Sequence, residues 1–258
     1  PLPGGRSFFR SIEAIDRAML ALVAARRAQP VEQGDMLSLL LEARDPDTGG
    51  ALSDREIRDQ LVTLFVAGLD TTAVALTWLL HLLSQHPAVE ARLRAELAVV
   101  LGDRLPTAAD LPKLSYTRAV LQETMRLYPP AWIFPRYTAT GAEVGGRWIA
   151  PGSSLLVSPF LAHRNPLQWE RPDSFEPDRF AEGTPKNQHR LAYLPFGAGG
   201  RMCIGNHFAM MEGVLATAMI LQRFRPTPSS DRPVLATAAS TLKPKGGLQM
   251  RMAPLSQA

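Results

Sequence analysis

The sequence is poor in cysteine, histidine and aromatic residues: its 258 residues include one cysteine, five histidines and 7% aromatic residues. A single cysteine excludes an internal disulfide and suits a reducing compartment, and no signal-peptide or lipidation pattern is visible, so we expect a cytoplasmic protein. The histidines are too far apart in sequence to form a short metal-ligand motif. The basic residues are mostly scattered arginines without interleaved aromatic residues, which argues against a nucleic-acid partner.

One long apolar run stands out in a chain whose 46% hydrophobic and 20% charged residues are typical of a globular protein. Residues 61–80 carry a single charge, Asp70. Such a run is long enough to cross a bilayer, but an aspartate at its centre costs about 2.5–3.5 kcal/mol on insertion. Gly68 and the nearby threonines weaken a membrane interpretation further. We therefore interpret the run as a helix buried in a large soluble protein and expect no membrane span.

Helical periodicity and breakers predict a mainly α fold with small β-sheets (α+β). The longest helix opens at a capping box, Ser53 to Glu56. From Arg136 onward the pattern changes to short strands, with a long ordered coil over 166–195. The helices are expected at 7–27, 36–42, 53–85, 87–101, 115–127 and 206–222, and the strands at a 143–148 hairpin, 153–157, 241–242 and 248–250.

The only cysteine lies in a glycine-rich loop, Phe196-Gly-Ala-Gly-Gly-Arg-Met-Cys-Ile-Gly205. A thiolate at Cys203 can hold haem iron axially and push electron density toward bound oxygen. The glycines let the backbone pass close to a flat macrocycle, and Arg201 can pair with a haem carboxylate. A phosphate-binding loop is the weaker alternative, because no Lys-Ser/Thr pair follows. Without these neighbours, a lone cysteine would be interpreted as an inert buried residue.

This loop resembles the haem-ligand loop of the cytochrome P450 family, and two further segments fit that resemblance. Glu123 and Arg126 are spaced to pair on one helix face. Arg179, in Phe175-Glu-Pro-Asp-Arg-Phe180, can supply the further partner that a buried pair needs. The resemblance implies that Glu123, Arg126 and Arg179 lock the coil that positions the cysteine loop.

A third segment, Ala67-Gly68-Leu69-Asp70-Thr71-Thr72, lies in the middle of the longest helix. Its glycine, aspartate and threonines are poor helix-interior residues and suggest a local distortion kept for a purpose. A polar kink satisfied by water is the alternative. The resemblance implies that the segment faces the distal side of a haem, where Ala67 and Gly68 belong to the haem site. Asp70 and Thr71 would there deliver the protons that cleavage of dioxygen requires.

The resemblance also assigns the remaining candidate residues. Arg136 and Arg201 would bind haem propionates, and Phe196 would shield the thiolate of Cys203, the metal ligand. Gly199 and Gly205 would complete the cofactor-binding loop, and Trp132, Ile133 and Phe134 would face the substrate. His163 is expected to be structural rather than a ligand.

The match runs from Ser7 to Met252 but corresponds to the C-terminal, haem-binding portion of a P450 sequence. We therefore expect residues 1–258 to form a partial P450 domain whose N-terminal part is missing. Its distal helix would span 53–85, its Glu-x-x-Arg helix 115–127 and its haem loop 196–205. Because the run at 61–80 is apolar all round, part of its surface would need a further cover.

The resemblance implies a haem-thiolate monooxygenase that binds haem b and inserts one atom of O2 into an apolar organic substrate. The chain has no flavin or iron–sulfur motif, so the electrons would come from a ferredoxin or a flavin reductase. Two alternatives stay open. One is a peroxide-using or isomerising haem-thiolate enzyme, against which the pair Asp70-Thr71 argues. The other is a truncated, non-catalytic remnant.

Overall fold

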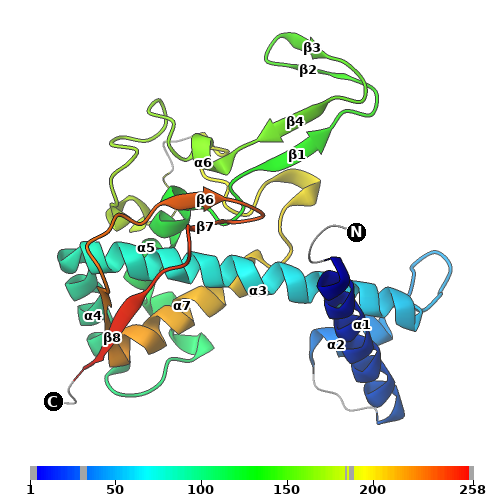
Figure 1. Ribbon diagram of the computed structural model, residues 1–258, viewed down its shortest axis with the longest axis horizontal. Coiled ribbons are helices and arrows are strands. Elements are labelled where there is room, and N and C mark those ends of the chain that lie inside the picture. The colour runs from blue at the N-terminus through cyan, green and yellow to red at the C-terminus, as the bar shows by residue number, and fades with distance from the viewer. Residues whose placement is uncertain (1–4, 30–33, 184, 186–188, 256–258) are drawn as a thin grey trace. The chain divides into compact units, whose positions relative to one another are not determined.

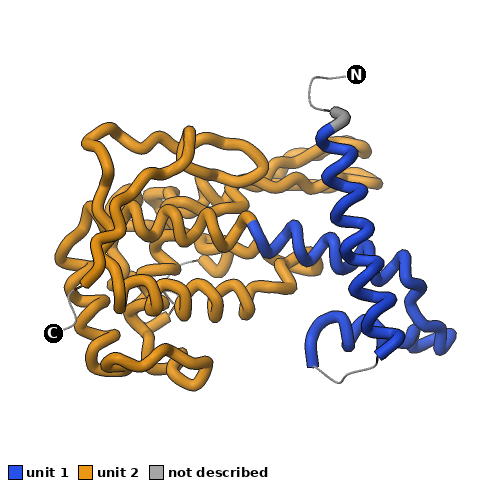
Figure 2. The backbone as a smooth tube through the Cα atoms, turned by 60° about the horizontal axis from the view of Figure 1, so that its bottom comes forward, with its two compact units in different colours: residues 1–69 blue, residues 70–258 orange. Residues whose placement is uncertain are grey.

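The computed structural model describes residues 5–29, 34–183, 185 and 189–255. The chain divides into two compact units, residues 1–69 and 70–258 (Figure 2). We name them unit 1 and unit 2. The boundary between the units falls within helix α3 (Asp54–Gln85), and the single partial P450 domain expected over 1–258 stays a prediction.

Unit 1 contains α1 (Gly5–Ala28), α2 (Met36–Glu42) and the first half of α3. Its small core is built on Val23, Leu37 and Ile57, all buried. The apolar face of α1 is largely exposed, with Phe8 62% exposed. The apolar stripe along α1 is therefore only partly used by the residues of unit 1.

The core of unit 2 is a cluster of four helices: the second half of α3, α4 (Pro87–Leu101), α5 (Ser115–Leu127) and α7 (Asn206–Arg223) (Figure 1). Helices α5 and α7 approach closely at Gly213, where an added Cβ would lie 2.6 Å from Cδ2 of Leu121. The cluster is built on buried apolar residues, among them Leu79, Leu83, Leu93, Leu97, Leu121, Val214, Ala218 and Leu221.

Helix α5 begins without a side-chain cap of its own, and Glu96 of α4 supplies one. The Glu96 carboxylate accepts hydrogen bonds from the backbone N–H groups of Tyr116 (2.7 Å) and Thr117 (2.9 Å) and from the Thr117 hydroxyl (2.7 Å). A carboxylate satisfies the free N–H groups of a helix start and complements its partial positive charge. The start of α5 is therefore fixed against α4.

The described strands form two-stranded antiparallel sheets, in agreement with the expected small sheets. They pair β1 (Phe134–Tyr137) with β4 (Ser154–Val157), β2 (Ala142–Val144) with β3 (Arg147–Ile149), β5 (Phe224–Pro228) with β8 (Met250–Pro254), and β6 (Ala236–Ala238) with β7 (Leu242–Pro244). Short helical turns complete the unit: α6 (Pro159–Ala162) and 3-10 helices at Ala108–Lys113, Pro177–Phe180 and Gly199–Arg201.

Strands β1, β5 and β6 were not expected from the sequence. Pro135 lies within β1, and Pro226 within β5. Proline removes a backbone donor and argues against a strand in the middle of a sheet. In a two-stranded ribbon each strand is an edge, so the proline nitrogen can face away from the partner and the strand is tolerated.

Of the described helices, α3 is long and apolar enough to cross a membrane by length and composition. Only 17% of its most apolar stretch is buried, although Trp78, Leu79 and Leu83, in unit 2, are fully buried. Nearer the N-terminal end of the apolar run, Phe65 and Leu69 are 45% and 64% exposed. This surface is the one that sequence analysis expected to need a cover.

Candidate functional site

The cysteine loop is closed by its own backbone immediately before α7. The N–H of Cys203 donates to the carbonyl of Phe196 at 2.9 Å, and the N–H of Met202 donates to the carbonyl of Gly199 at 3.0 Å. Gly197 and Gly199 adopt φ of 72° and 75°, the left-handed region that favours glycine. The glycines thus allow the tight path that brings the cysteine back beside the start of the loop.

The thiol of Cys203 is free and exposed. Its apolar neighbours are exposed as well: Met202 by 52%, Ile204 by 88% and Phe208 by 64%. Several large apolar side chains exposed close together in the sequence are typical of a binding site. Phe196 is half-buried and packs against the helical core of unit 2, while its shielding of the thiolate stays a prediction.

Two arginines that were predicted to bind acidic groups carry no acidic partner. Arg201 is exposed, and among the described residues no group forms a hydrogen bond or ion pair with it. Arg136, on β1, donates to the carbonyl of Pro135 at 3.0 Å and lies 4.7 Å from the ring centre of Phe134. Both guanidinium groups are therefore available to carboxylates of a ligand.

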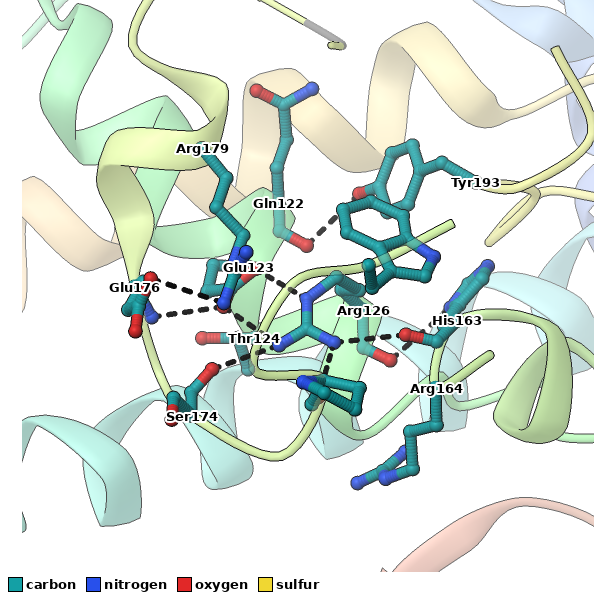
Figure 3. A network of polar contacts seen from close by, with 12 residues as sticks. Gln122, Glu123, Thr124, Arg126, His163, Arg164, Ser174, Glu176, Arg179 and Tyr193 are labelled. Carbon is teal, nitrogen blue, oxygen red and sulfur yellow. Dashed lines mark hydrogen bonds and ion pairs between the residues drawn. The ribbon is translucent and has the colours of Figure 1, made fainter. Parts of the chain in front are cut away.

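Glu123 and Arg126 form a fully buried ion pair on α5 (Figure 3). The pair is bidentate, with Nε–Oε2 at 2.7 Å and Nη2–Oε1 at 2.9 Å. Arg126 also donates to three backbone carbonyls, those of His163 (2.9 Å), Pro172 (2.6 Å) and Ser174 (2.9 Å). These bonds satisfy the remaining donors that a buried arginine must place.

Arg179 joins this pair, as the sequence motif suggested. Its Nε lies 3.5 Å from Oε1 of Glu123, and its Nη2 pairs with Glu176 at 3.0 Å. The backbone N–H of Glu176 donates to Glu123 at 2.9 Å. Burial raises the pKa of Glu123, and the hydrogen bonds and charges of Arg126 and Arg179 oppose that rise. The structure thus brings the three predicted residues together.

His163 connects this network to the segment that enters the cysteine loop. Its Nε2 accepts the backbone N–H of Leu194 at 2.9 Å, so its Nδ1 carries the hydrogen that faces the carbonyl of Arg126 at 3.2 Å. The Tyr193 hydroxyl donates to the carbonyl of Gln122 at 3.0 Å. Burial lowers the pKa of His163 to about 4. His163 is therefore a neutral structural residue, as expected, and it ties α5 to the loop.

The motif on α3 lies on both sides of the unit boundary. Ala67 and Gly68 belong to unit 1, and Asp70 and Thr71 begin unit 2. The helix is α-helical throughout, so the expected distortion is not a break in the helix. An added Cβ at Gly68 would meet no described atom within 4 Å. The Asp70 carboxylate instead bonds outside the helix, since its Oδ2 accepts a hydrogen bond from the Thr241 hydroxyl at 2.7 Å.

Sequence reasoning missed Thr241, and no local signal could have found it. The residue lies 171 positions from Asp70 in the chain, in a segment predicted only as a short strand.

The residues predicted to face substrate, Trp132, Ile133 and Phe134, are all half-buried. The Trp132 indole N–H donates to the carbonyl of Ala239 at 2.9 Å, in the turn between β6 and β7 that also contains Thr241. This hydrogen bond joins segments 107 residues apart, so composition and local pattern could not predict it.

Comparison with known proteins identifies the family. The family model for Cytochrome P450 matches residues 2–252. The chain belongs to the cytochrome P450 family. It is 44% identical over 249 residues to a cyclooctatin synthase of Streptomyces melanosporofaciens, a match that covers 94% of this chain and 54% of that protein. It is 37% identical to a pentalenene oxygenase of Streptomyces avermitilis, covering 98% of this chain and 56% of that one.

The fold is likewise that of a P450. A crystal structure of the cytochrome P450DA heme domain superposes with a TM-score of 0.90 at 32% identity, over 97% of this chain and 55% of that one. The chain thus spans about half the length of the curated relatives it matches. The predicted mainly α fold with small sheets is confirmed.

The cofactor of a P450 is haem, and the residues of the cysteine loop fit it. The free thiol of Cys203 suits iron, and the exposed Ile204 and Phe208 suit an apolar macrocycle. Arg136 and Arg201, which have no acidic partner among the described residues, suit its propionates. Among the described residues no group of three or more histidine, cysteine, aspartate or glutamate side chains offers another metal site. The chemistry of the available donors therefore agrees with haem as the cofactor.

Proposed function

We propose that this chain forms the haem-thiolate centre of a monooxygenase. The overall reaction would convert a C–H bond, O2, two electrons and two protons into an alcohol and water. The observation that carries this proposal is the free, exposed Cys203 at the end of a closed glycine loop, among exposed apolar side chains. A relative from Streptomyces melanosporofaciens named cyclooctat-9-en-7-ol 5-monooxygenase, 42% identical to this chain, supports the reaction class.

Each residue of the site would have a defined task. Cys203 would ligate the iron as a thiolate, while Arg201 and Arg136 would hold the propionates. When bound, the haem would supply the chemistry of dioxygen activation, which the thiolate of Cys203 would support by donating electron density. The Glu123–Arg126–Arg179 network and His163 would keep the loop in place without taking part in the chemistry.

Proton delivery is assigned to Asp70 and Thr71. The Asp70 carboxylate uses Oδ2 to accept the Thr241 hydroxyl, and among the described residues no group bonds to its Oδ1. That oxygen is free to exchange a proton with water, as a general acid–base group must. Thr71 follows directly in the helix and would pass the proton onward through its hydroxyl.

Electron donor, substrate and location complete the proposal. The electrons would come from a ferredoxin or a flavin reductase, since the relatives named as monooxygenases support the need for a redox partner. The substrate would be an apolar organic molecule, and the relatives named for pentalenene and for cyclooctat-9-en-7-ol support that class. The single cysteine supports a reducing, cytoplasmic location.

The test is the carbon monoxide difference spectrum of the reduced, haem-loaded protein. We expect the long-wavelength Soret band of a thiolate-ligated haem, and we expect Cys203→Ser to abolish it. Met202→Leu is the matched control, since it removes the other sulfur of the loop and should keep the band. A band typical of imidazole ligation in the unaltered protein, or its survival in Cys203→Ser, contradicts the proposal. Turnover with peroxide but none with an electron donor would favour the peroxide-using alternative.

A further inference from the structure

The turn of the β6–β7 hairpin contacts Asp70 of α3. The Thr241 hydroxyl donates to Oδ2 of Asp70 at 2.7 Å. Thr241 is 6% exposed, whereas Asp70 is exposed. Figure 1 shows β6 and β7 lying along the second half of α3. A nearly buried hydroxyl therefore holds one oxygen of an exposed carboxylate.

The residue next to Thr241 is fixed through both of its main-chain groups. The Leu242 N–H donates to the carbonyl of Pro130 at 3.0 Å, and the Leu242 carbonyl accepts the indole N–H of Trp78 at 2.8 Å. Trp78 lies about two turns beyond Asp70 on α3 and is fully buried, stacked on Tyr128 with ring centres 3.8 Å apart. The hairpin is thus attached to α3 at two points, and the Thr241 hydroxyl has a defined position.

The other side of the same turn is held by Trp132. Its indole N–H donates to the Ala239 carbonyl at 2.9 Å, and the Ala239 N–H donates to the carbonyl of Thr241 at 3.1 Å. A chain of hydrogen bonds therefore runs from Trp132 through the turn to Asp70. The carboxylate is held by a segment distant in sequence rather than by its own helix.

We propose that Thr241 is a positioning residue that orients the Asp70 carboxylate for proton delivery. An aspartate on an exposed helix surface can rotate, and proton transfer needs the donor oxygen in a fixed place. The Thr241 hydroxyl holds Oδ2 and so directs Oδ1 toward water. This inference deepens the proposed monooxygenase function and rests on it.

The first test measures the hydrogen bond itself, without turnover. The urea unfolding midpoint is compared for Thr241→Val, Asp70→Ala and the double variant. We expect the double variant to unfold at about the midpoint of the less stable single variant, because each change removes the same bond. Thr237→Val is the matched control, a threonine of the same hairpin whose hydroxyl has no partner among the described residues, and its midpoint shift should add to that of Asp70→Ala. Additive shifts for Thr241→Val and Asp70→Ala would overturn the proposal.

The second test follows the fate of electrons in the haem-loaded protein supplied with substrate and a reductase chain. Poor proton delivery releases hydrogen peroxide, which takes up one O2, two electrons and two protons. We expect Thr241→Val to lower the product formed per electron pair by roughly two- to tenfold, the range that one hydrogen bond represents. The hydrogen peroxide released should rise by the amount that accounts for the electron pairs no longer used to form product. Thr241→Ser should restore the yield, and Thr237→Val should keep it.

The outcomes separate the two claims. A thiolate carbon monoxide spectrum with an unchanged yield in Thr241→Val would overturn the positioning role and leave the monooxygenase proposal standing. Loss of yield in Thr241→Ser equal to that in Thr241→Val would overturn the role as well, since the hydroxyl would then be irrelevant. No thiolate spectrum in the unaltered protein would overturn the monooxygenase function and the proton-delivery role together, while the urea comparison would still judge the Thr241–Asp70 bond.

Discussion

The indole N–H of Trp78 donates a 2.8 Å hydrogen bond to the carbonyl of Leu242, which lies 164 residues further along the chain. The bond is buried and joins α3 to the start of β7. A buried carbonyl that loses its donor costs about 1–3 kcal/mol. This contact attaches the β6–β7 hairpin to α3 together with the hydrogen bond from Thr241 to Asp70.

Replacing Trp78 by phenylalanine should test that attachment. Phenylalanine keeps an apolar ring but leaves the Leu242 carbonyl unpaired, so we expect Trp78→Phe to lower the free energy of unfolding by about 2 kcal/mol. Urea unfolding followed by circular dichroism gives the measurement. Trp148→Phe is the control, because Trp148 is 69% exposed. Equal losses in both variants would contradict a special role for the bond.

Arg126→Lys should be strongly destabilising although it keeps the charge. Lysine cannot reproduce the bidentate pair with Glu123 or the three carbonyl contacts, and breaking a buried pair costs about 3–5 kcal/mol. Chemical denaturation measures the loss. Arg118→Lys, an exposed arginine on the same helix, should stay within about 0.5 kcal/mol of the unaltered protein. A loss in Arg126→Lys no larger than that in Arg118→Lys would show that the network is unimportant.

Stability should fall as the pH falls between about 6.5 and 4 because of His163. Burial lowers the pKa of His163 to about 4, from an ordinary 6.5. Below pH 6.5 His163 is protonated in the unfolded chain but stays neutral in the folded chain, so protonation stabilises the unfolded state and lowers the free energy of unfolding. The loss should reach about 3 kcal/mol near pH 4. His81, whose pKa burial also lowers, adds a change of the same sign.

The measurement is the free energy of unfolding at several pH values in this window. His163→Gln should be less stable overall but should flatten the pH dependence. His207→Gln, at an exposed position, should leave the slope unchanged. An unchanged slope in His163→Gln would mean that other groups cause the pH effect.

Gly213→Ala should destabilise the contact between α5 and α7. Alanine favours a helix by about 1 kcal/mol over glycine, but the new Cβ would lie 2.6 Å from Cδ2 of the buried Leu121. Overpacking of a core costs about 1–3 kcal/mol. Adding Leu121→Val should recover part of the loss, as thermal unfolding can show. Gly68→Ala gives the contrast, because its Cβ meets no described atom within 4 Å and the change should stabilise the helix. A more stable Gly213→Ala would show that Leu121 moves aside freely.

Helices α1 to α5 and α7 could be predicted from sequence to within two residues, because the residues that begin and end them are local signals. The short helix α6 and the 3-10 helices were not predicted, and one of them, Pro177–Phe180, lies within the coil expected over 166–195. Pro87 begins α4. Ser53 immediately precedes α3 and Glu56 lies in its first turn, and Pro129 follows the end of α5 at Leu127. The cysteine loop was predictable for the same reason, since its glycines and its arginine are neighbours in the chain. The proline-containing strands β1 and β5 were not, because only their partners make those prolines acceptable.

The contacts that join distant segments were only partly predictable. The Glu123–Arg126 pair followed from the i, i+3 spacing, and Arg179 was added from the resemblance to the P450 family. The hydrogen bond from Thr241 to Asp70 has no signal in the local sequence. Nothing in residues 238–242 differs from an ordinary turn between short strands. Such a bond depends on the tertiary path of the hairpin, and that path is decided by Trp78 and Pro130 rather than by the hairpin itself.

Apart from the carboxylate of Glu123, the buried Arg126 binds main-chain oxygens, those of His163, Pro172 and Ser174. Any residue offers the same carbonyl, so the coil it holds is free to change its side chains at Pro172 and Ser174 as long as its path is kept. Insertions or deletions between these carbonyls would be far more damaging than substitutions. Arg126 therefore constrains the length of this coil more than its amino-acid composition.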